Sequence, residues 1–205
     1  MTQQTDTKVR AKVWLRPAQV DDLRSACYDV GADYLQQRNE AMIALMYDTG
    51  VRVGELVSID VDHLRESNRA LYLPTRLQKD YPTDSSPPPA TLELASDVSR
   101  LLSSYLTNRW KDSAALFPSR SADRITTQGV RDALRKISVA AGVEPYLLDG
   151  SRGEPGDVTP HALRHSVAFR MMNAEDGNEL YDVRNRLRHR SITTTEQVYD
   201  HILRR

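Results

Sequence analysis

The stretch that decides the fold is TPHALRHSV, residues 159–167, which begins a predicted helix. Thr159 suits the N-cap position and Pro160 the first helical position, because proline has no N–H to lose there. On this helix His161 and Arg164 lie three residues apart and share one face. A helix amino terminus beside a guanidinium and an imidazole predicts a binding site for an anion, above all a phosphate.

The other side chains of this stretch leave alternatives open. Leu163 and Val167 point away from the basic face and are predicted to enter the core. His161 and His165 have the spacing of zinc ligands, but the zinc-binding pattern HExxH needs a glutamate where the chain has alanine. Arg164 would also repel a cation. The remaining alternative is an ordinary helix start with one core histidine and one surface arginine.

The composition limits the class of protein. The chain has 205 residues, 40% of them hydrophobic, which is enough for one well-cored domain. The 28 basic and 28 acidic residues cancel, so a role with nucleic acid must rest on local clustering. Such a cluster occurs in VRNRLRHRS, residues 183–191, and the residues predicted to contact DNA are Arg184, Arg186, Arg188 and Arg190. The alternative is a solvated charged face.

Features of secreted and membrane proteins are missing from the sequence. The one cysteine, Cys27, has no partner for an internal disulfide, and the amino terminus has no apolar segment like that of a signal peptide. No apolar run is long enough to cross a bilayer. We therefore expect a cytoplasmic protein without a membrane partner.

The pattern along the chain is mostly helical. Helices are predicted over residues 16–31, 33–50, 96–110, 126–142, 159–177, 179–189 and 191–203. Gly50 and Gly142 mark helix ends, whereas Ser96 or Asp97 and Thr126 are predicted caps. Three short strands of an antiparallel sheet are predicted over residues 70–74, 76–82 and 90–94. The sequence thus predicts a mainly α fold with a small three-stranded antiparallel sheet.

Two further stretches bear on the predicted phosphate site. DTGVRVGEL, residues 48–56, places Arg52 between a helix stop and a new helical turn, with Glu55 available to orient it. LRHRSITTTEQVYDH, residues 187–201, provides His189 and then Tyr199 on a predicted terminal helix. Taken singly, these features favour a surface arginine at a helix junction and a tyrosine that packs on an amphipathic helix.

In this order and at these distances, the stretches resemble the catalytic domain of the tyrosine recombinases, the phage-integrase family. The resemblance runs from Trp14 to the carboxyl end of the chain, residues 14–205. It implies a DNA breaking-rejoining domain that cleaves and rejoins strands through a covalent 3′-phosphotyrosine, with no metal or other cofactor. The function implied is that of a site-specific DNA recombinase or integrase acting on double-stranded DNA.

The resemblance also implies a role for each site residue. The catalytic set that it gives is Arg52, Lys79, His161, Arg164, His189 and Tyr199. The two arginines would bind the scissile phosphate, the two histidines would complete its binding site, and the tyrosine would be the nucleophile. The lysine, the only one between Glu55 and Trp110, would protonate the leaving 5′ oxygen. His165 would be structural.

The chemistry needs these side-chain types. Charge gathers on the non-bridging oxygens of a phosphodiester under attack, and guanidinium groups offer paired donors to such oxygens. A phenol, whose pKa is about 10, needs a positive field and a proton acceptor, and a neutral His161 would serve as that acceptor. We found no carboxylate cluster suited to Mg²⁺ and no glycine-rich phosphate loop in the sequence.

This sequence departs from the family pattern at several points. Arg188 stands where the family usually has glycine, and Tyr199 lies one residue further from His189 than in many members. The stretch around Lys79 lacks the common glycine-rich turn. We expect residues 1–13 to be extended or disordered, the family's amino-terminal core-binding domain to be absent, and the carboxyl tail to be minimal.

Other functions remain open at this point. One is a DNA-binding accessory protein of the same fold with weak catalysis, and another is relaxation of DNA by type IB topoisomerase chemistry. A third is a metal-dependent hydrolase that uses His161, His165 or His189, for which the acidic ligands are missing. For the recombinase we expect a protein that is mostly monomeric when free and forms a tetramer on DNA.

Overall fold

The computed structural model describes residues 13–78, 86–147, 149–173, 175 and 178–191. Within these residues the helices are α1 (Pro17–Ala26), α2 (Asp33–Thr49), α3 (Val53–Ser58), α4 (Ser96–Asn108), α5 (Thr127–Ala141), α6 (Pro160–Asn173) and α7 (Leu180–Leu187). The strands are β1 (Leu64–Arg65), β2 (Ala70–Leu73) and β3 (Ala90–Glu93), and short 3-10 turns cover Val61–His63, Thr75–Leu77 and Pro155–Asp157. The mainly α fold with a small antiparallel sheet is confirmed.

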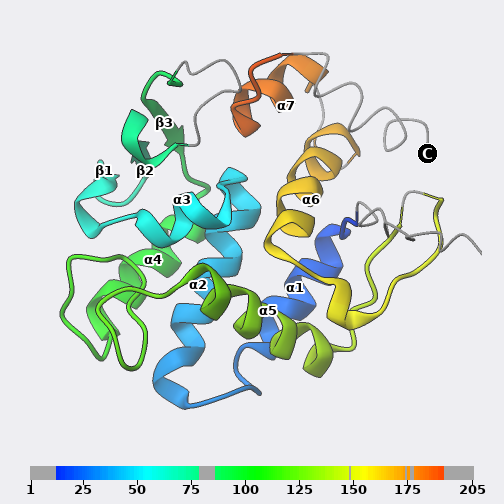
Figure 1. Cartoon of the computed structure of the whole chain (residues 1–205). Coiled ribbons are helices and arrows are strands. Elements are labelled where there is room, and N and C mark those ends of the chain that lie inside the picture. The colour runs from blue at the N-terminus through cyan, green and yellow to red at the C-terminus, as the bar shows by residue number, and fades with distance from the viewer. Residues whose placement is uncertain (1–12, 79–85, 148, 174, 176–177, 192–205) are drawn as a thin grey trace, which may run out of the picture.

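Helix α2 is the central element of the core. It contacts α1, α4, α5 and α6, and Figure 1 shows these helices around it. Its residues 41–46 are all buried, as the apolar run AMIALM predicts. The sheet lies at one end of this helical core, and α7 lies between the sheet and α6 (Figure 1). The core therefore supports α6, and α7 packs on α6; these two helices carry the basic motifs.

The end of α2 follows the sequence prediction. Gly50 has φ of +64°, the left-handed conformation that ends many helices and that glycine adopts most easily. A Cβ at Gly50 would lie 2.3 Å from Cδ2 of Leu187, the last residue of α7. Only glycine therefore lets the ends of α2 and α7 approach this closely.

The sheet has the predicted number of strands, but one of them comes from a different segment. The order is β1-β2-β3, all antiparallel, with Leu71 opposite both Leu64 and Leu92. The strand predicted over residues 76–82 is wrong where the structure describes it, because Thr75–Leu77 forms a 3-10 turn after Pro74. The third strand is Leu64–Arg65 instead.

The hairpin between β1 and β2 explains the missed strand. Its turn contains three non-glycine residues with positive φ, namely Glu66, Ser67 and Asn68. Turns of this conformation are usually recognised in a sequence by glycine. Without that signal, and with β1 only two residues long, this pairing could not be predicted.

Helix starts were predicted with mixed success. Thr126 accepts a hydrogen bond from the N–H of Gly129 at 3.0 Å, and Thr159 accepts one from Ala162 at 3.2 Å, so both predicted caps are confirmed. Gly142, with φ of +61°, ends α5 as predicted. The predicted Ser96 or Asp97 cap is wrong, since Ala95 occupies the N-cap position and both residues lie in the first turn of α4.

The start of the described chain is fixed to α6 by aromatic stacking. The ring of Trp14 lies 4.6 Å from the ring of Tyr146 and 4.1 Å from that of Phe169. The backbone of Trp14 also exchanges two hydrogen bonds with Tyr146. The long loop before α6 is thus held against both the amino-terminal segment and α6. Among the described residues, no helix has the length and apolar character needed to span a membrane.

Replacement of Gly50 by alanine should destabilise the domain by about 2–5 kcal/mol. A left-handed residue with a Cβ costs about 1–2 kcal/mol, and the overlap with Leu187 adds the cost of overpacking, about 1–3 kcal/mol. Urea denaturation measures the loss.

The matched control is Gly142→Ala. Gly142 has nearly the same φ and also ends a helix, but nothing lies within 4 Å of the position of its Cβ. The free energy of unfolding of this variant should fall only by the conformational cost, about 1–2 kcal/mol. Equal losses in the two variants would show that the approach of α7 to Gly50 is not a constraint.

Candidate active site

The first component of the site is an arginine held by a buried carboxylate. Arg52 precedes α3, and its Nη1 donates to Oε1 of Glu55 at 3.0 Å. Oε2 of the same carboxylate accepts the backbone N–H of Arg52 at 2.7 Å. The Glu55 side chain is only 2% exposed, whereas that of Arg52 is 34% exposed. Glu55 thus orients a guanidinium that solvent or a ligand can still reach.

The second component is Arg164 of α6, which is almost completely buried. Its Nη1 donates to the carbonyl of Gly50, and its Nη2 donates to the carbonyl of Leu187. These carbonyls lie at the carboxyl ends of α2 and α7, where the helix dipole is negative. Arg164 therefore joins its own helix, α6, to α7 and to α2, which lies far away in the sequence. The surface-arginine alternative for this residue is wrong.

The third component is the turn that follows α7. Arg188 ends this helix with φ of 54° and ψ of 47°, and its Nη2 lies 2.5 Å from Oε2 of Glu55. The next residue, His189, is half-buried. Leu187, Arg188 and His189 thus bring a carbonyl, a guanidinium and an imidazole to the same place.

The pKa of His189 shows how closely the basic groups converge. Burial, which has the largest effect, and the positive charges of Arg164, Arg52 and Arg188 together lower this pKa to about 3, with a smaller effect from His161. The contacts agree with this, since Arg164 bonds to the carbonyl of Leu187, two residues before His189, and Arg52 shares Glu55 with the adjacent Arg188. His189 is therefore a neutral imidazole at neutral pH, able both to donate and to accept a hydrogen bond.

The two histidines of α6 have different environments. His161 is exposed at the start of the helix, whereas His165 is buried and 4% exposed. Their ring centroids lie 4.2 Å apart in an edge-to-face arrangement. His161 can therefore meet a ligand, and His165 supports its ring from the core side.

Two of the predicted catalytic residues, Lys79 and Tyr199, lie outside the described residues. Arg52, His161, Arg164 and His189 are brought together, but their catalytic roles remain predictions. Gln78, the last described residue before the lysine, lines a pocket of about 210 Å³ together with Pro87–Ala90, two residues of α7, and Arg188 and His189 of the turn that follows α7. The segment that carries the lysine therefore begins beside the site.

The four arginines predicted to contact DNA do not share one face. Arg184 and Arg186, the two that lie on α7, point about 200° apart, whereas Arg188 and Arg190 come after the helix has ended. Arg186 donates to the backbone and side chain of Asp48 and to the carbonyl of Glu93, and thereby fixes α7 to α2 and β3. Arg188 turns toward Glu55, whereas Arg190 is exposed.

The remaining arginine of this group, Arg184, is partly buried. Its Nη2 donates to the carbonyl of Arg190 at 3.2 Å, and its guanidinium lies 5.3 Å from the ring of the exposed Tyr181. The DNA role of the four arginines stays a prediction. Arg186 and Arg188, however, face inward and pair with Asp48 and Glu55.

Sequence reasoning missed two functional partners. Asp48 is 5% exposed and pairs with Arg186 at 2.8 Å, which holds α7 in place, but an aspartate near a helix end gives no sign of such a distant partner. The second is the pairing of Arg188 with Glu55, because the sequence predicts Arg188 as a DNA contact and as a departure from the family pattern, not as a partner within the site. The signal that was available is the position of Arg188 directly before His189.

One group of possible metal ligands occurs in the described part of the chain, formed by Asp60, Asp62 and His63. Asp60 already pairs with Arg124, and Nδ1 of His63 accepts the backbone N–H of Asp60 at 2.9 Å. These contacts account for the group without an ion. His189, in turn, lies among three guanidinium groups that would repel a cation.

Comparison with known proteins identifies the class. The model of the phage integrase family matches residues 13–205, so the chain belongs to that family. Tyrosine recombinase XerC of Bifidobacterium longum (strain DJO10A) is 34% identical over 170 residues, which are 81% of this chain and 44% of that protein. The chain thus spans less than half the length of this relative.

Solved structures of recombinases share the fold. The XerA recombinase has a TM-score of 0.71 and 23% identity, and the match covers 98% of this chain and 64% of that one. The Tn1549 transposon integrase in complex with a circular intermediate DNA has a TM-score of 0.70 and 20% identity, over 95% of this chain and 63% of that one. The predicted fold family is therefore confirmed.

The pKa of His189 predicts how stability depends on pH. Because the folded-state pKa, about 3, lies below that of the unfolded chain, about 6.5, the unfolded chain binds the proton first. The free energy of unfolding should fall as pH drops below about 6.5, by at most about 1.4 kcal/mol per pH unit from this group. His189→Gln should lose this part of the dependence.

Nuclear magnetic resonance measures the titration directly. Between about pH 8 and about pH 4, where an ordinary histidine titrates, the ring proton signal of His189 should stay constant. The His189→Gln variant assigns that signal. An inflection near pH 6.5 would show that the ring is not held among the three guanidinium groups.

Proposed function

We propose that this chain is the catalytic domain of a site-specific DNA recombinase or integrase, which cleaves and rejoins strands through a covalent 3′-phosphotyrosine. The observation that carries the proposal is the convergence of three guanidinium groups with His161 and His189. They come from the start of α3, from α6 and from the end of α7. Membership of the phage integrase family and the likeness to tyrosine recombinase XerC support it.

The described residues suit the binding of a phosphodiester. Arg52 is oriented by Glu55 and remains accessible, and Arg164 is fixed by two carbonyls before any ligand arrives. Preorganised donors of this kind stabilise the charge that develops on a phosphate under attack without reorganising during the reaction. Neutral His189 donates a hydrogen bond to a phosphate oxygen, and exposed His161 accepts a proton.

Tyr199 and Lys79 complete the proposed reaction. The tyrosine oxygen attacks the phosphorus, a new 3′-phosphotyrosine bond forms, and the bond to the 5′ oxygen breaks. Lys79 gives a proton to that oxygen as it leaves. Attack by the 5′ hydroxyl on the phosphotyrosine reverses these steps and rejoins a strand, so the bond energy is conserved.

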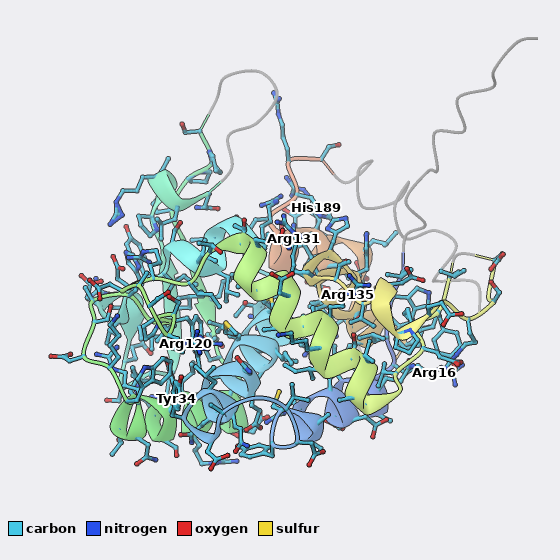
Figure 2. The ribbon with its side chains drawn as sticks, turned by 60° about the horizontal axis from the view of Figure 1, so that its bottom comes forward. Arg16, Tyr34, Arg120, Arg131, Arg135 and His189 are labelled. Carbon is cyan, nitrogen blue, oxygen red and sulfur yellow. The ribbon has the colours of Figure 1, made fainter. Side chains whose placement is uncertain are left out.

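Double-stranded DNA is the proposed partner. The Tn1549 transposon integrase structure is a complex with a circular intermediate DNA, and this chain shares its fold. Besides Arg190, the exposed Arg131 and Arg135 of α5 are candidates for phosphate contact; Figure 2 shows both in the same view as His189. With so few arginines available for phosphate contact, we expect non-specific binding. Its dissociation constant should lie near the ~10⁻⁴–10⁻⁶ M typical of backbone contacts at physiological salt.

Assembly on the DNA is a separate part of this proposal. We propose that four copies assemble around two duplexes and that the free chain is mostly monomeric. Light scattering with and without DNA measures this. A stable tetramer of the free protein would contradict it.

A nicked suicide substrate tests the proposed reaction. In EDTA the wild-type chain should form a covalent protein–DNA adduct, and Tyr199→Phe should abolish the adduct, because it removes only the attacking oxygen. Binding of DNA by the variant, followed by fluorescence anisotropy, should be nearly unchanged.

The matched control for this test is Tyr181→Phe. Tyr181 is the nearest other tyrosine in the sequence and is 57% exposed. Its loss should leave the adduct at the wild-type level. An adduct that survives in Tyr199→Phe but disappears in Tyr181→Phe would move the nucleophile to Tyr181. DNA binding with no adduct in the wild type would favour the accessory-protein alternative.

Substitution of Lys79 by alanine tests the leaving-group role. Cleavage of ordinary DNA should slow by about 10²–10⁴-fold, the usual contribution of a general acid. A substrate with sulfur at the bridging 5′ position should restore the rate, because a thiolate leaves without a proton. Equal impairment on both substrates would assign the proton to another donor, with His189 the next candidate.

A further inference from the structure

The backbone at Arg188 is unusual for an arginine. This residue ends α7 in the left-handed conformation, with φ of 54° and ψ of 47°. Glycine adopts this conformation without strain, whereas a residue with a Cβ does so at a cost. A strained residue beside a functional site points to a role for its side chain.

The side chain of Arg188 makes one strong contact, and it is buried. Only 7% of it is exposed, and its Nη2 lies 2.5 Å from Oε2 of Glu55. Its Nε is buried without a hydrogen-bond partner in the described part of the chain. Burial also lowers the pKa of Arg188, and Glu55 partly opposes this effect. A hydrophobic residue would fill this position at a lower cost.

The contact makes Glu55 a shared carboxylate. Oε1 accepts from the side chain of Arg52, and Oε2 accepts from the backbone of Arg52 and from Arg188. Two guanidinium groups and one carboxylate carry one net positive charge. Without Arg188, the pair of Arg52 and Glu55 would be neutral, and the field toward a bound phosphate would be weaker.

We propose that Arg188 is a positioning residue of the recombination site, acting through Glu55. It holds the Glu55 carboxylate against Arg52, keeps the group of three net positive, and fixes the turn that carries His189. It does not itself touch the phosphate. This inference rests on the proposed function of the site.

Three variants separate charge from shape. Arg188→Met keeps much of the side-chain length without the charge, Arg188→Lys keeps the charge, and Arg188→Gly removes both and also the backbone strain. The charge-matched control is Arg100→Met, because Arg100 is exposed on α4 and belongs to no part of the site. Thermal unfolding shows which variants are folded.

The first readout is the rate of adduct formation with DNA in saturating excess, together with the dissociation constant for DNA. Arg188→Met and Arg188→Gly should slow adduct formation by about 10²-fold, the loss expected when a catalytic group is misplaced by about 1 Å. Arg188→Lys should recover part of this rate. The dissociation constant should change only a few-fold, and Arg100→Met should match the wild type in both.

The second readout needs no DNA. The charged groups that lower the pKa of His189 are Arg52, which precedes α3, Arg164 and His161 of α6, and Arg188 of its own turn. Loss of the Arg188 charge should therefore raise the pKa of His189 in Arg188→Met and Arg188→Gly, measured by nuclear magnetic resonance. Arg188→Lys and Arg100→Met should leave it near the wild-type value.

The outcomes are distinct. A folded Arg188→Gly protein that forms the adduct at the wild-type rate overturns the inference, as does a His189 pKa that does not move in either uncharged variant. If Arg188→Met does not fold, Arg188→Gly and Arg188→Lys decide by the same criteria. If the wild type forms no adduct, the proposed function fails, and the titration alone decides whether Arg188 controls the field at His189.

Discussion

The buried guanidinium of Arg164 is the interaction on which the rest of the site depends. It donates to the carbonyls of Gly50 and Leu187, which end α2 and α7. A buried cation is costly unless polar groups replace its water, and the negative ends of two helix dipoles do so here. The three helices α2, α6 and α7 therefore converge at one point, and their loops carry the other basic groups.

The close packing at this point follows from the absence of a side chain. Gly50 leaves room for Leu187, and the same glycine ends α2 with the carbonyl that Arg164 needs. Arg186 adds a second fixation of α7, through Asp48 at the end of α2. The turn after α7 thus has little freedom, and the imidazole of His189 is held in place by the fold rather than by a ligand.

The charge of the site is local and separate from that of the whole chain. Acidic and basic residues balance over the sequence, yet Arg52 and Arg188 share the single carboxylate of Glu55, and Arg164 is paired only with backbone carbonyls among the contacts described above. Burial strengthens this field, because the dielectric response is weak there. Burial of the ring, aided by this field, keeps His189 neutral, so it can donate a hydrogen bond without adding charge. An anion that enters meets fixed donors.

Local rules predicted much of the fold. The caps at Thr126 and Thr159 and the helix ends at Gly50 and Gly142 depend on backbone chemistry within a few residues, and they were predicted correctly. Strand β1 was missed because its partner and its turn have no local signature. A two-residue strand exists only through its pairing.

What the sequence by itself determined is the set of chemical groups and the helix phases, including the shared face of His161 and Arg164 and the orientation of Arg52 by Glu55. Only the tertiary structure decided which arginines face inward. Arg186 and Arg188 look alike in an alternating basic run, but one meets Asp48 and the other Glu55. Their partners are far away in the sequence, and such pairing depends on how helices pack, which no local pattern encodes.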